Sequence, residues 1–353
     1  MSIEGHPYRK AFAAHAAAPG VAPLFLHGPA LEVLRDLPDA SIACCLTSPP
    51  YFGKREYASG GLGLERDPQS YLRALIEIAA EIARVLEPTG SFWLNIGDAY
   101  RDKQLLGLPW RLVIALCDEQ GWTLRNSIVW NKVKGGPDTA RDRLRIVSED
   151  VFHLVRQPRG YYYDVDAIRA APSRATVRNG AVVSATGVRG VRYRRQLELS
   201  TALTDAERAS ALAALDAMLA AVAAGELSDF RMIIRGQQRT THSDSERVSG
   251  RAKELRDRGY YFLRYHPNGA KPSNVWDILP EDTHRRDPHF APFPEDLCKI
   301  PILATCPPTG MVLDPFCGTG TTSRVARSFG RKSVGIDLAR PYLEEADRRC
   351  RDA

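Results

Sequence analysis

Apolar runs and amphipathic stretches alternate along the first 130 residues of the chain. Ile42–Thr47 is an unbroken apolar run that ends before two prolines, which is the pattern of a buried parallel strand. Ser70–Leu86 carries apolar residues at helical spacing and stops before Pro88 and Gly90, so it predicts a helix. Weaker patterns predict two strands and one helix, at Ser91–Ile96, Thr123–Trp130 and Trp110–Asp118. Such alternation predicts a mostly parallel sheet with crossover helices.

The pattern changes between about residues 171 and 270, where the chain becomes Arg-rich and irregular. One helix is predicted there, at Asp205–Ala224, because Thr204 and Glu207 have capping-box spacing and Gly225 follows. After residue 310 the alternation resumes, with strands at Met311–Leu313 and Ser333–Ile336, a helix between them to about Phe329, and a C-terminal helix. The chain is therefore expected to form one α/β sheet domain from both of its ends, with an insert between them.

These patterns divide the chain into four parts. The first is an Ala-rich N-terminal arm, residues 1–22, which we expect to be loosely held. Residues 23–170 and 276–353 are the two halves of the sheet domain, and residues 171–275 are the insert.

Composition narrows the class of protein without indicating a function. The chain has 353 residues, 44% hydrophobic and 25% charged, with a mean hydropathy of −0.28, which excludes a disordered or fibrous chain. No run of about 18 apolar residues occurs, and His15 interrupts the Ala-rich stretch, so neither a membrane span nor a signal peptide is expected. Seven cysteines without Cys-x-x-Cys spacing argue against a disulfide scaffold or zinc cage. We expect a cytoplasmic protein without a metal site.

The net charge of +6 is concentrated in the insert. Residues 171–270 hold 16 Lys and Arg against 10 Asp and Glu, whereas the rest of the chain holds 32 of each. A neutral sheet domain with a basic insert predicts an anionic partner at the insert.

A glycine-rich turn, Asp314–Thr322, follows the strand predicted at Met311–Leu313. Gly318 and Gly320 allow a ligand to approach the backbone closely, and the N-terminus of the next helix favours an anionic group. Asp337 stands 17 residues after Gly320, at the end of the next strand, where an acidic side chain suits the hydroxyls of a ribose. The pair predicts a nucleoside cofactor, and a tight structural turn is the alternative.

A second turn, Ser48-Pro49-Pro50-Tyr51, directly follows the strand at Ile42–Thr47. Two consecutive prolines have fixed φ angles and no N–H, so the carbonyl groups of this turn are rigidly aimed and able to accept hydrogen bonds. The Ser48 hydroxyl is a further acceptor, and the Tyr51 ring offers an aromatic face for stacking. Together these groups suit an exocyclic amine on a heterocycle. The alternative is a proline-terminated strand with a packing Tyr.

Together the two turns resemble the motifs of the amino-group DNA methyltransferases that use S-adenosylmethionine. In that family Asp-Pro-Phe-x-Gly-x-Gly binds the cofactor, and Ser/Asp-Pro-Pro-Tyr binds the flipped target base. The order here is similar to that of the permuted β-group, and the resemblance covers roughly 250 residues. It implies a circularly permuted, Rossmann-like mixed α/β sheet with helices on both faces and an inserted target-recognition region.

The resemblance also assigns roles to individual residues. The implied catalytic residues are Ser48, Pro49, Pro50 and Tyr51. The implied cofactor-binding residues are Phe293, Pro294, Asp314, Pro315, Phe316, Gly318, Gly320, Thr321, Thr322 and Asp337. One departure is Gly28-Pro29, where family members usually have Gly-Asp.

The family chemistry is direct methyl transfer to the exocyclic nitrogen of a base flipped out of duplex DNA, without a metal or a covalent enzyme–base intermediate. Ser48 and the Pro49 carbonyl would accept the two amine hydrogens, and Tyr51 would stack on the base, with Phe52 as the second aromatic. Ser before Pro-Pro-Tyr is associated mostly with cytosine-N4, and Asp with adenine-N6. We therefore expect a sequence-specific cytosine-N4 methyltransferase in restriction-modification or epigenetic marking. Adenine-N6 methylation, methylation of RNA or of a protein glutamine, and an inactive DNA-binding homologue are the alternatives.

DNA contacts are expected in the basic insert. The candidates are Arg174, Arg178, Arg189, Arg192, Arg194 and Arg195, and Phe52 from the first half. A second patch is formed by Arg231, Arg235, Arg239, Arg247 and Arg251. A solvated flexible loop is the alternative for the first set. The partner is double-stranded DNA, while a cognate restriction endonuclease and a monomeric or homodimeric state stay open.

Overall fold

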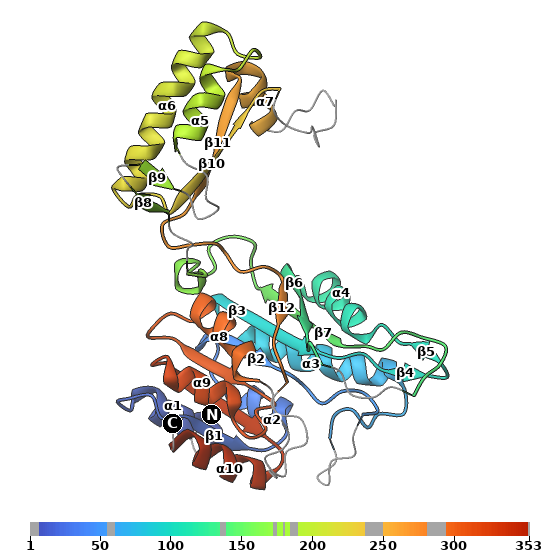
Figure 1. Cartoon of the computed structure of the whole chain (residues 1–353). Coiled ribbons are helices and arrows are strands. Elements are labelled where there is room, and N and C mark those ends of the chain that lie inside the picture. Colours follow the sequence, from blue (N-terminus) through green and yellow to red (C-terminus); the bar gives the residue numbers. More distant parts are fainter. Residues whose placement is uncertain are drawn as a thin grey trace. The chain divides into compact units, whose positions relative to one another are not determined.

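A computed structural model describes residues 7–54, 61–134, 139–171, 175–178, 181–183, 190–236, 250–280 and 294–351. The chain divides into two compact units, one made of Met1–Ala167 with Ser273–Ala353 and the other of Ile168–Pro272 (Figure 1). The insert expected at 171–275 spans nearly the same residues as the second unit.

An eight-stranded mixed sheet forms the centre of the first unit (Figure 1). Its order is β1-β14-β13-β2-β3-β7-β6-β12, in which β7 runs antiparallel to β3 and β6 and the other neighbours are parallel. The strands are β1 (Leu24–His27), β2 (Ile42–Thr47), β3 (Leu86–Ile96), β6 (Thr123–Asn131), β7 (Ser148–Val155), β12 (Val275–Asp277), β13 (Met311–Asp314) and β14 (Lys332–Asp337). A small hairpin, β4 (Tyr100–Arg101) with β5 (Gln104–Leu105), lies apart from the sheet.

Helices cover both faces of this sheet. The helices are α1 (Pro7–Ala17), α2 (Ala30–Asp36), α3 (Pro68–Val85), α4 (Leu108–Gln120), α8 (Glu295–Thr305), α9 (Thr321–Ser328) and α10 (Arg340–Arg351). Cys45 of β2 belongs to the apolar cluster with α1 to α4, whereas its neighbours Cys44 and Leu46 belong to the cluster with α8 and α9. Because successive strand residues point to opposite faces, these two clusters are the two sides of the sheet.

The predicted mixed sheet with helices on both faces is confirmed, and β2 coincides with the predicted strand. Asp67 caps the start of α3 by accepting from the Ser70 amide, and α4 ends at Gly121, whose φ of +73° suits glycine. Strand β13, from the C-terminal end of the chain, lies between β14 and β2. A circular permutation relative to other methyltransferase sheets stays a prediction.

The second unit has more regular structure than the sequence indicates. Its elements are β8 (Thr176–Arg178), β9 (Ala181–Val183), α5 (Gly190–Glu198), α6 (Asp205–Ala223), β10 (Asp229–Ile234), α7 (Gly250–Arg258) and β11 (Tyr260–Tyr265). The capping box of α6 is confirmed, but the described residues on either side of it also form helices and strands, where irregular chain was expected. Tyr193 and Leu197 of α5 lie one helical turn apart and pack with Leu215 and Phe230. Two apolar residues in a run of arginines are too weak a period to reveal such a helix.

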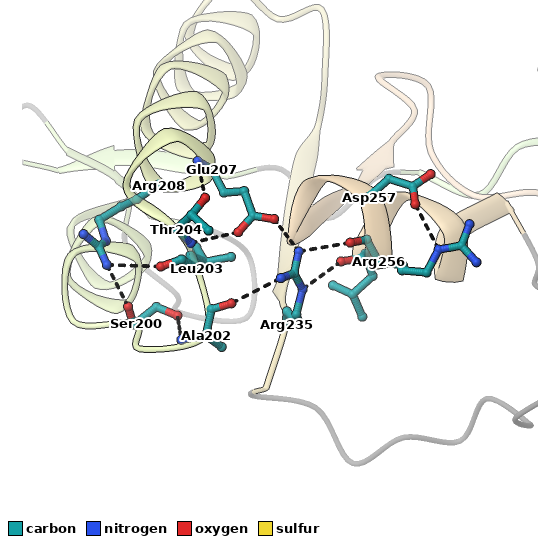
Figure 2. Close-up of polar contacts among 10 residues, drawn as sticks. Ser200, Ala202, Leu203, Thr204, Glu207, Arg208, Arg235, Arg256 and Asp257 are labelled. Atoms are coloured by element: carbon teal, nitrogen blue, oxygen red, sulfur yellow. Dashed lines mark hydrogen bonds and ion pairs between the residues drawn. The ribbon is translucent and has the colours of Figure 1, made fainter.

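Arg235, directly after β10, links several segments of this unit (Figure 2). Its guanidinium pairs with Glu207 at 2.5 Å and donates to the carbonyls of Ala202, Leu255 and Arg256 at 3.4, 3.2 and 3.1 Å. Five N–H donors in a fixed fork make Arg suited to such a set of acceptors. The hydrogen bonds join the start of α6 to β10 and the end of α7, so this member of the second arginine patch is part of the packing. Arg239 and Arg247 lie outside the described residues.

In the described part of the N-terminal arm, Pro7–Ala17 forms the packed helix α1, so the expectation that this stretch is loosely held is wrong. Phe12 of α1 is only 4% exposed and joins the core on one face of the sheet. The Asp36 carboxylate accepts from the first helical amides, at Tyr8 and Arg9, and Lys332 donates to three carbonyls at the other end. An acceptor at the N-terminus and a cation at the C-terminus both favour the helix. The partners lie in distant segments, so the local pattern does not show them.

A buried carboxylate ties together the strands at the centre of the sheet. Asp314 Oδ1 accepts from Thr47 Oγ1 at 2.6 Å and from the Phe316 amide at 3.1 Å, and its Oδ2 accepts from Thr322 Oγ1 at 2.6 Å. Burial raises the pKa of Asp314 to about 6, despite these three donors. The ends of β2 and β13 and the start of α9 are therefore held by one side chain.

In the part of the chain that the structure describes, no helix combines the length and the apolar character needed to cross a membrane.

Phe12→Ala tests whether α1 is packed. Removal of a buried aromatic ring should lower the free energy of unfolding of the first unit by about 3 kcal/mol. Lys10→Ala, on an exposed position of the same helix, should change it by less than about 0.5 kcal/mol. Chemical denaturation of both variants and the wild type gives the comparison. An equally small effect in both variants would mean that the arm is loosely held after all.

Asp314→Asn tests the buried carboxylate through pH. The folded chain binds a proton on Asp314 more tightly than the unfolded chain, because the pKa rises from 3.8 to about 6. The stability that this residue contributes is therefore greatest at low pH and is lost as the pH rises through about 6. Between pH 5 and pH 7.5, the free energy of unfolding of the wild type should fall by about 1.4 kcal/mol relative to that of the Asn variant. Denaturant unfolding at both pH values measures this difference, and a pH-independent difference would contradict the assignment.

Candidate active site

The glycine-rich turn joins β13 to α9. Gly320 has a φ of +76°, and a Cβ there would lie 2.7 Å from the Ala346 Cβ of α10, so only glycine fits. Arg349 of α10 donates to the Thr319 carbonyl and hydroxyl at 2.9 and 2.6 Å and to Thr321 Oγ1 at 3.3 Å. Among the described residues, no side chain caps the start of α9. Its amide groups and the positive end of the helix dipole are therefore available to a carboxylate.

Asp337, at the end of β14, closes the same turn from the other side. Its Oδ2 accepts from the Gly318 amide at 2.9 Å, and its Oδ1 accepts from the Ala339 amide at 2.8 Å. Burial raises the pKa of its carboxyl group. Each oxygen keeps a second lone pair, so the geometry is compatible with hydroxyl groups of a ribose.

The other residues expected at the cofactor lie around this turn, with one exception. Pro315 is buried and Phe316 is half-buried, while Pro294 is buried at the start of α8. Thr322 donates to Asp314, and both oxygens of Asp314 already have partners, so these two residues shape the turn. Phe293 lies outside the described residues.

The Ser-Pro-Pro-Tyr turn begins where β2 ends. Tyr71 Oη donates to the Pro50 carbonyl at 2.9 Å, which holds the turn against α3. The Pro49 carbonyl receives no hydrogen bond from the described part of the chain. Ser48 Oγ is half-buried and lies 3.2 Å from Tyr51 Oη. A carbonyl without a donor among the described residues and a hydroxyl therefore lie next to each other in this turn.

Tyr51 is fixed by residues from β3 and β7. Its hydroxyl donates to Glu149 Oε2 at 2.7 Å and lies 3.2 Å from Asn95 Oδ1. Burial, together with the nearby Glu149 carboxylate, raises the pKa of Tyr51 well above its usual value. Lys132 Nζ contacts Glu149 Oε1 at 2.5 Å. The tyrosine thus stays protonated and rigid beside Ser48.

The two turns lie at one edge of the sheet. Thr47 comes directly before Ser48 and donates to Asp314, the first residue of the glycine-rich turn. Strands β2 and β13 are parallel neighbours, with Cys45 opposite Leu313. Their carboxyl ends therefore meet, which is where open α/β sheets bind their ligands.

Other residues near these strand ends have structural roles. Phe52, a DNA-contact candidate, is 8% exposed and packs on Tyr71 at 5.5 Å between ring centroids, so little of its ring is open to solvent. Trp93 stacks on His153 at 4.2 Å, and burial lowers the pKa of that His to about 3. Asp98 accepts from the first amides of α4, at residues 107 and 108.

The arginines expected to contact DNA are only partly described. Arg192 and Arg195 are exposed on α5, whereas Arg194 forms an ion pair with Asp216 of α6. Arg178 lies in β8, but its side chain is not described, and Arg174 and Arg189 lie outside the described residues. Exposed positive charge therefore remains on α5.

Sequence reasoning missed Glu149, Lys132 and Arg349 as parts of the site. Lys132 comes two residues after the strand predicted at Thr123–Trp130, and its place near a strand end could have singled it out. Glu149 and Arg349 have no local motif, because their positions follow from the pairing of β7 with β3 and from the contact of α10 with α9.

Comparisons with known proteins agree with this geometry. The family model N6_N4_Mtase, described as DNA methylase, matches residues 42–348. The type II methyltransferase M.SfiI of Streptomyces fimbriatus is 32% identical, over 90% of this chain and 88% of its own length. M.Cfr9I of Citrobacter freundii is 28% identical, over 90% of this chain and 84% of its own.

A solved structure supports the fold. The PvuII DNA methyltransferase, described as cytosine-N4-specific, superposes with a TM-score of 0.56 and 17% identity, over 94% of this chain and 89% of that one. The family match makes S-adenosylmethionine the cofactor of this chain. The two turns at the sheet edge and the match over most of the sequence lead to one conclusion. The chain belongs to the DNA methylase family that methylates exocyclic amines, adenine-N6 or cytosine-N4.

Proposed function

We propose that the chain is a type II, sequence-specific DNA methyltransferase that methylates the N4 amine of cytosine in duplex DNA. The observation that carries the proposal is the Ser48 turn held beside the glycine-rich turn through the Thr47–Asp314 hydrogen bond. Ser, not Asp, precedes Pro-Pro-Tyr, and this favours cytosine-N4 within the family. Relatives named as type II methyltransferases support a place in restriction-modification, beside a cognate endonuclease.

The mechanism follows from two acceptors at fixed positions. A nucleobase amine is a poor nucleophile because its lone pair is delocalised into the ring. When Ser48 Oγ and the Pro49 carbonyl accept its two hydrogens, electron density remains on nitrogen and the lone pair is aimed in line. S-adenosylmethionine supplies the electrophilic methyl group when bound at the glycine-rich turn. Flipping the base costs a few kcal/mol, which stacking on Tyr51 would offset.

The residues of the glycine-rich turn fit that cofactor. The uncapped start of α9 suits the carboxylate of its methionine part, and the Asp337 carboxylate suits its ribose. Pro294, Pro315 and Phe316 would provide apolar contact, with Phe293 as a further candidate. Asp314 and Thr322 would act by holding the shape of the turn.

The second unit would recognise the DNA sequence. Arg192 and Arg195 of α5 are exposed and can reach phosphate or base edges, whereas Arg194 and Arg235 pair with carboxylates of the same unit. We propose DNA contact through α5, with Arg174, Arg178 and Arg189 as further candidates in the preceding segment.

Ser48→Ala tests the reaction and its product. Loss of one acceptor of the amine should slow methyl transfer by roughly 100-fold while leaving cofactor binding unchanged. Mass spectrometry of nucleosides from DNA treated with the wild type should detect N4-methylcytosine. Detection of N6-methyladenine alone would show that the target is the N6 amine of adenine and not the N4 amine of cytosine. If the wild type transferred no methyl group, an inactive DNA-binding homologue would be favoured.

Arg192→Ala with Arg195→Ala tests the DNA contact. The double variant should bind DNA more weakly, and the slope of log K against log salt should decrease in magnitude by about 2. The matched control, Arg348→Ala with Arg351→Ala, removes the same charge from α10 of the first unit. Fluorescence anisotropy at several salt concentrations measures the slope. If the slopes of both double variants equal that of the wild type, α5 is not at the DNA interface.

A further inference from the structure

A chain of hydrogen bonds connects Ser48 to Lys132 through Tyr51 and Glu149. Ser48 Oγ lies 3.2 Å from Tyr51 Oη, which lies 2.7 Å from Glu149 Oε2. The other oxygen of Glu149 contacts Lys132 Nζ at 2.5 Å. Only 27% of the Lys132 side chain and 13% of the Glu149 side chain are exposed, so water screens this ion pair weakly.

The charges at the end of this chain set the direction of its hydrogen bonds. A carboxylate can only accept and an ammonium can only donate, so Glu149 accepts from both Lys132 and Tyr51. Tyr51 has a single proton, and its shortest contact is with Glu149. The Tyr51 oxygen must then accept from Ser48. With its proton directed at Tyr51, Ser48 has only lone pairs to offer a ligand.

Further contacts keep Glu149 in place. Asn95 of β3 donates from Nδ2 to Glu149 Oε2 at 3.2 Å and to the Asp150 carbonyl at 3.1 Å. Lys132 also lies over the Trp130 ring, 4.8 Å from its centroid. A purely structural role for Lys132 and Glu149, as a cross-strand ion pair, would not need the hydrogen bond from Tyr51. The second oxygen of Glu149 is what connects the pair to the Ser-Pro-Pro-Tyr turn.

We propose that Glu149, supported by Lys132, is a positioning residue that makes Ser48 an obligatory hydrogen-bond acceptor for the target amine and takes up the proton that the methylated amine loses. The proposal rests on the proposed function. In the transfer the N–C bond forms while the C–S bond breaks and leaves its electron pair on sulfur. The amine proton passes to Ser48 Oγ, the Ser48 proton to Tyr51 and the Tyr51 proton to Glu149. The carboxyl group then releases the proton to water, so one methyl group moves and one proton leaves.

Glu149→Gln is the central test. Gln has the same size, but its amide can donate to Tyr51, which would then donate to Ser48 and turn the Ser48 proton toward the amine. The single-turnover rate should fall roughly 100-fold, while the KM for DNA and the Kd for S-adenosylmethionine stay within about 2-fold. Glu149→Asp keeps the charge and should recover part of the rate. Tritiated S-adenosylmethionine and genomic DNA from a host lacking this methyltransferase are the substrates.

A double-mutant cycle separates the relay from a structural role. Tyr51→Phe removes the connecting hydroxyl and leaves the Lys132–Glu149 pair in place, so it should slow transfer to a similar extent. If Glu149 acts through Tyr51, adding Glu149→Gln to Tyr51→Phe should cause little further loss. Independent, multiplying losses would overturn the relay. This comparison remains informative if Glu149→Gln lowers the thermal stability.

A control and the wild type distinguish the possible failures. Glu119→Gln removes an exposed carboxylate from α4 and should transfer at the wild-type rate. If the wild type methylates DNA and Glu149→Gln methylates it equally fast, this inference is overturned and the proposed function is left intact. A wild type that transfers no methyl group to DNA overturns the proposed function, and this inference with it.

Discussion

The hydrogen bond between Thr47 and Asp314 connects residues 267 positions apart, and the two functional turns depend on it. Thr47 ends β2 and Asp314 ends β13, so this bond fixes the residue directly before the Ser-Pro-Pro-Tyr turn against the first residue of the glycine-rich turn. Burying an ionisable carboxylate is unfavourable, even though three donors meet it here. Direct methyl transfer requires the donor and acceptor sites to be aligned within a fraction of an ångström, which gives a reason for such a rigid connection.

Three side chains from other elements hold the Ser-Pro-Pro-Tyr turn and the residue before it. Asp314 holds the residue before it, Tyr71 of α3 holds the Pro50 carbonyl, and Glu149 of β7 holds the Tyr51 hydroxyl. Within the described residues, the Pro49 carbonyl has no hydrogen-bond donor and the Ser48 hydroxyl contacts Tyr51 Oη. Prolines alone restrict only φ, so the orientation of the two acceptors depends on these tertiary contacts as much as on the motif.

Elements with strong local signals could be predicted from the sequence, to within two residues. The apolar run of β2, the amphipathic α3 and the capping box of α6 are examples. Helix α1 was not predicted as packed, because Asp36 and Lys332 hold its ends from distant segments. Glu149 could not be found at all, since a single acidic residue has meaning only once β7 is known to lie beside β3. Motifs thus indicate the chemistry, while the residues that orient the motifs come from the fold.

The arginines of the second unit show that a count of charged residues is also a limited guide to function. The excess of basic residues there predicts an anionic partner, but a count does not distinguish a solvent-facing side chain from one used in packing. Arg235 is surrounded by three carbonyls and Glu207, and Arg194 is paired with Asp216, whereas Arg192 and Arg195 are exposed on the same helix as Arg194. An arginine that is paired with a carboxylate contributes less to the positive charge of the surface than an exposed one. Arg235 and Arg194 therefore help to hold this unit together, whereas Arg192 and Arg195 leave positive charge on its surface.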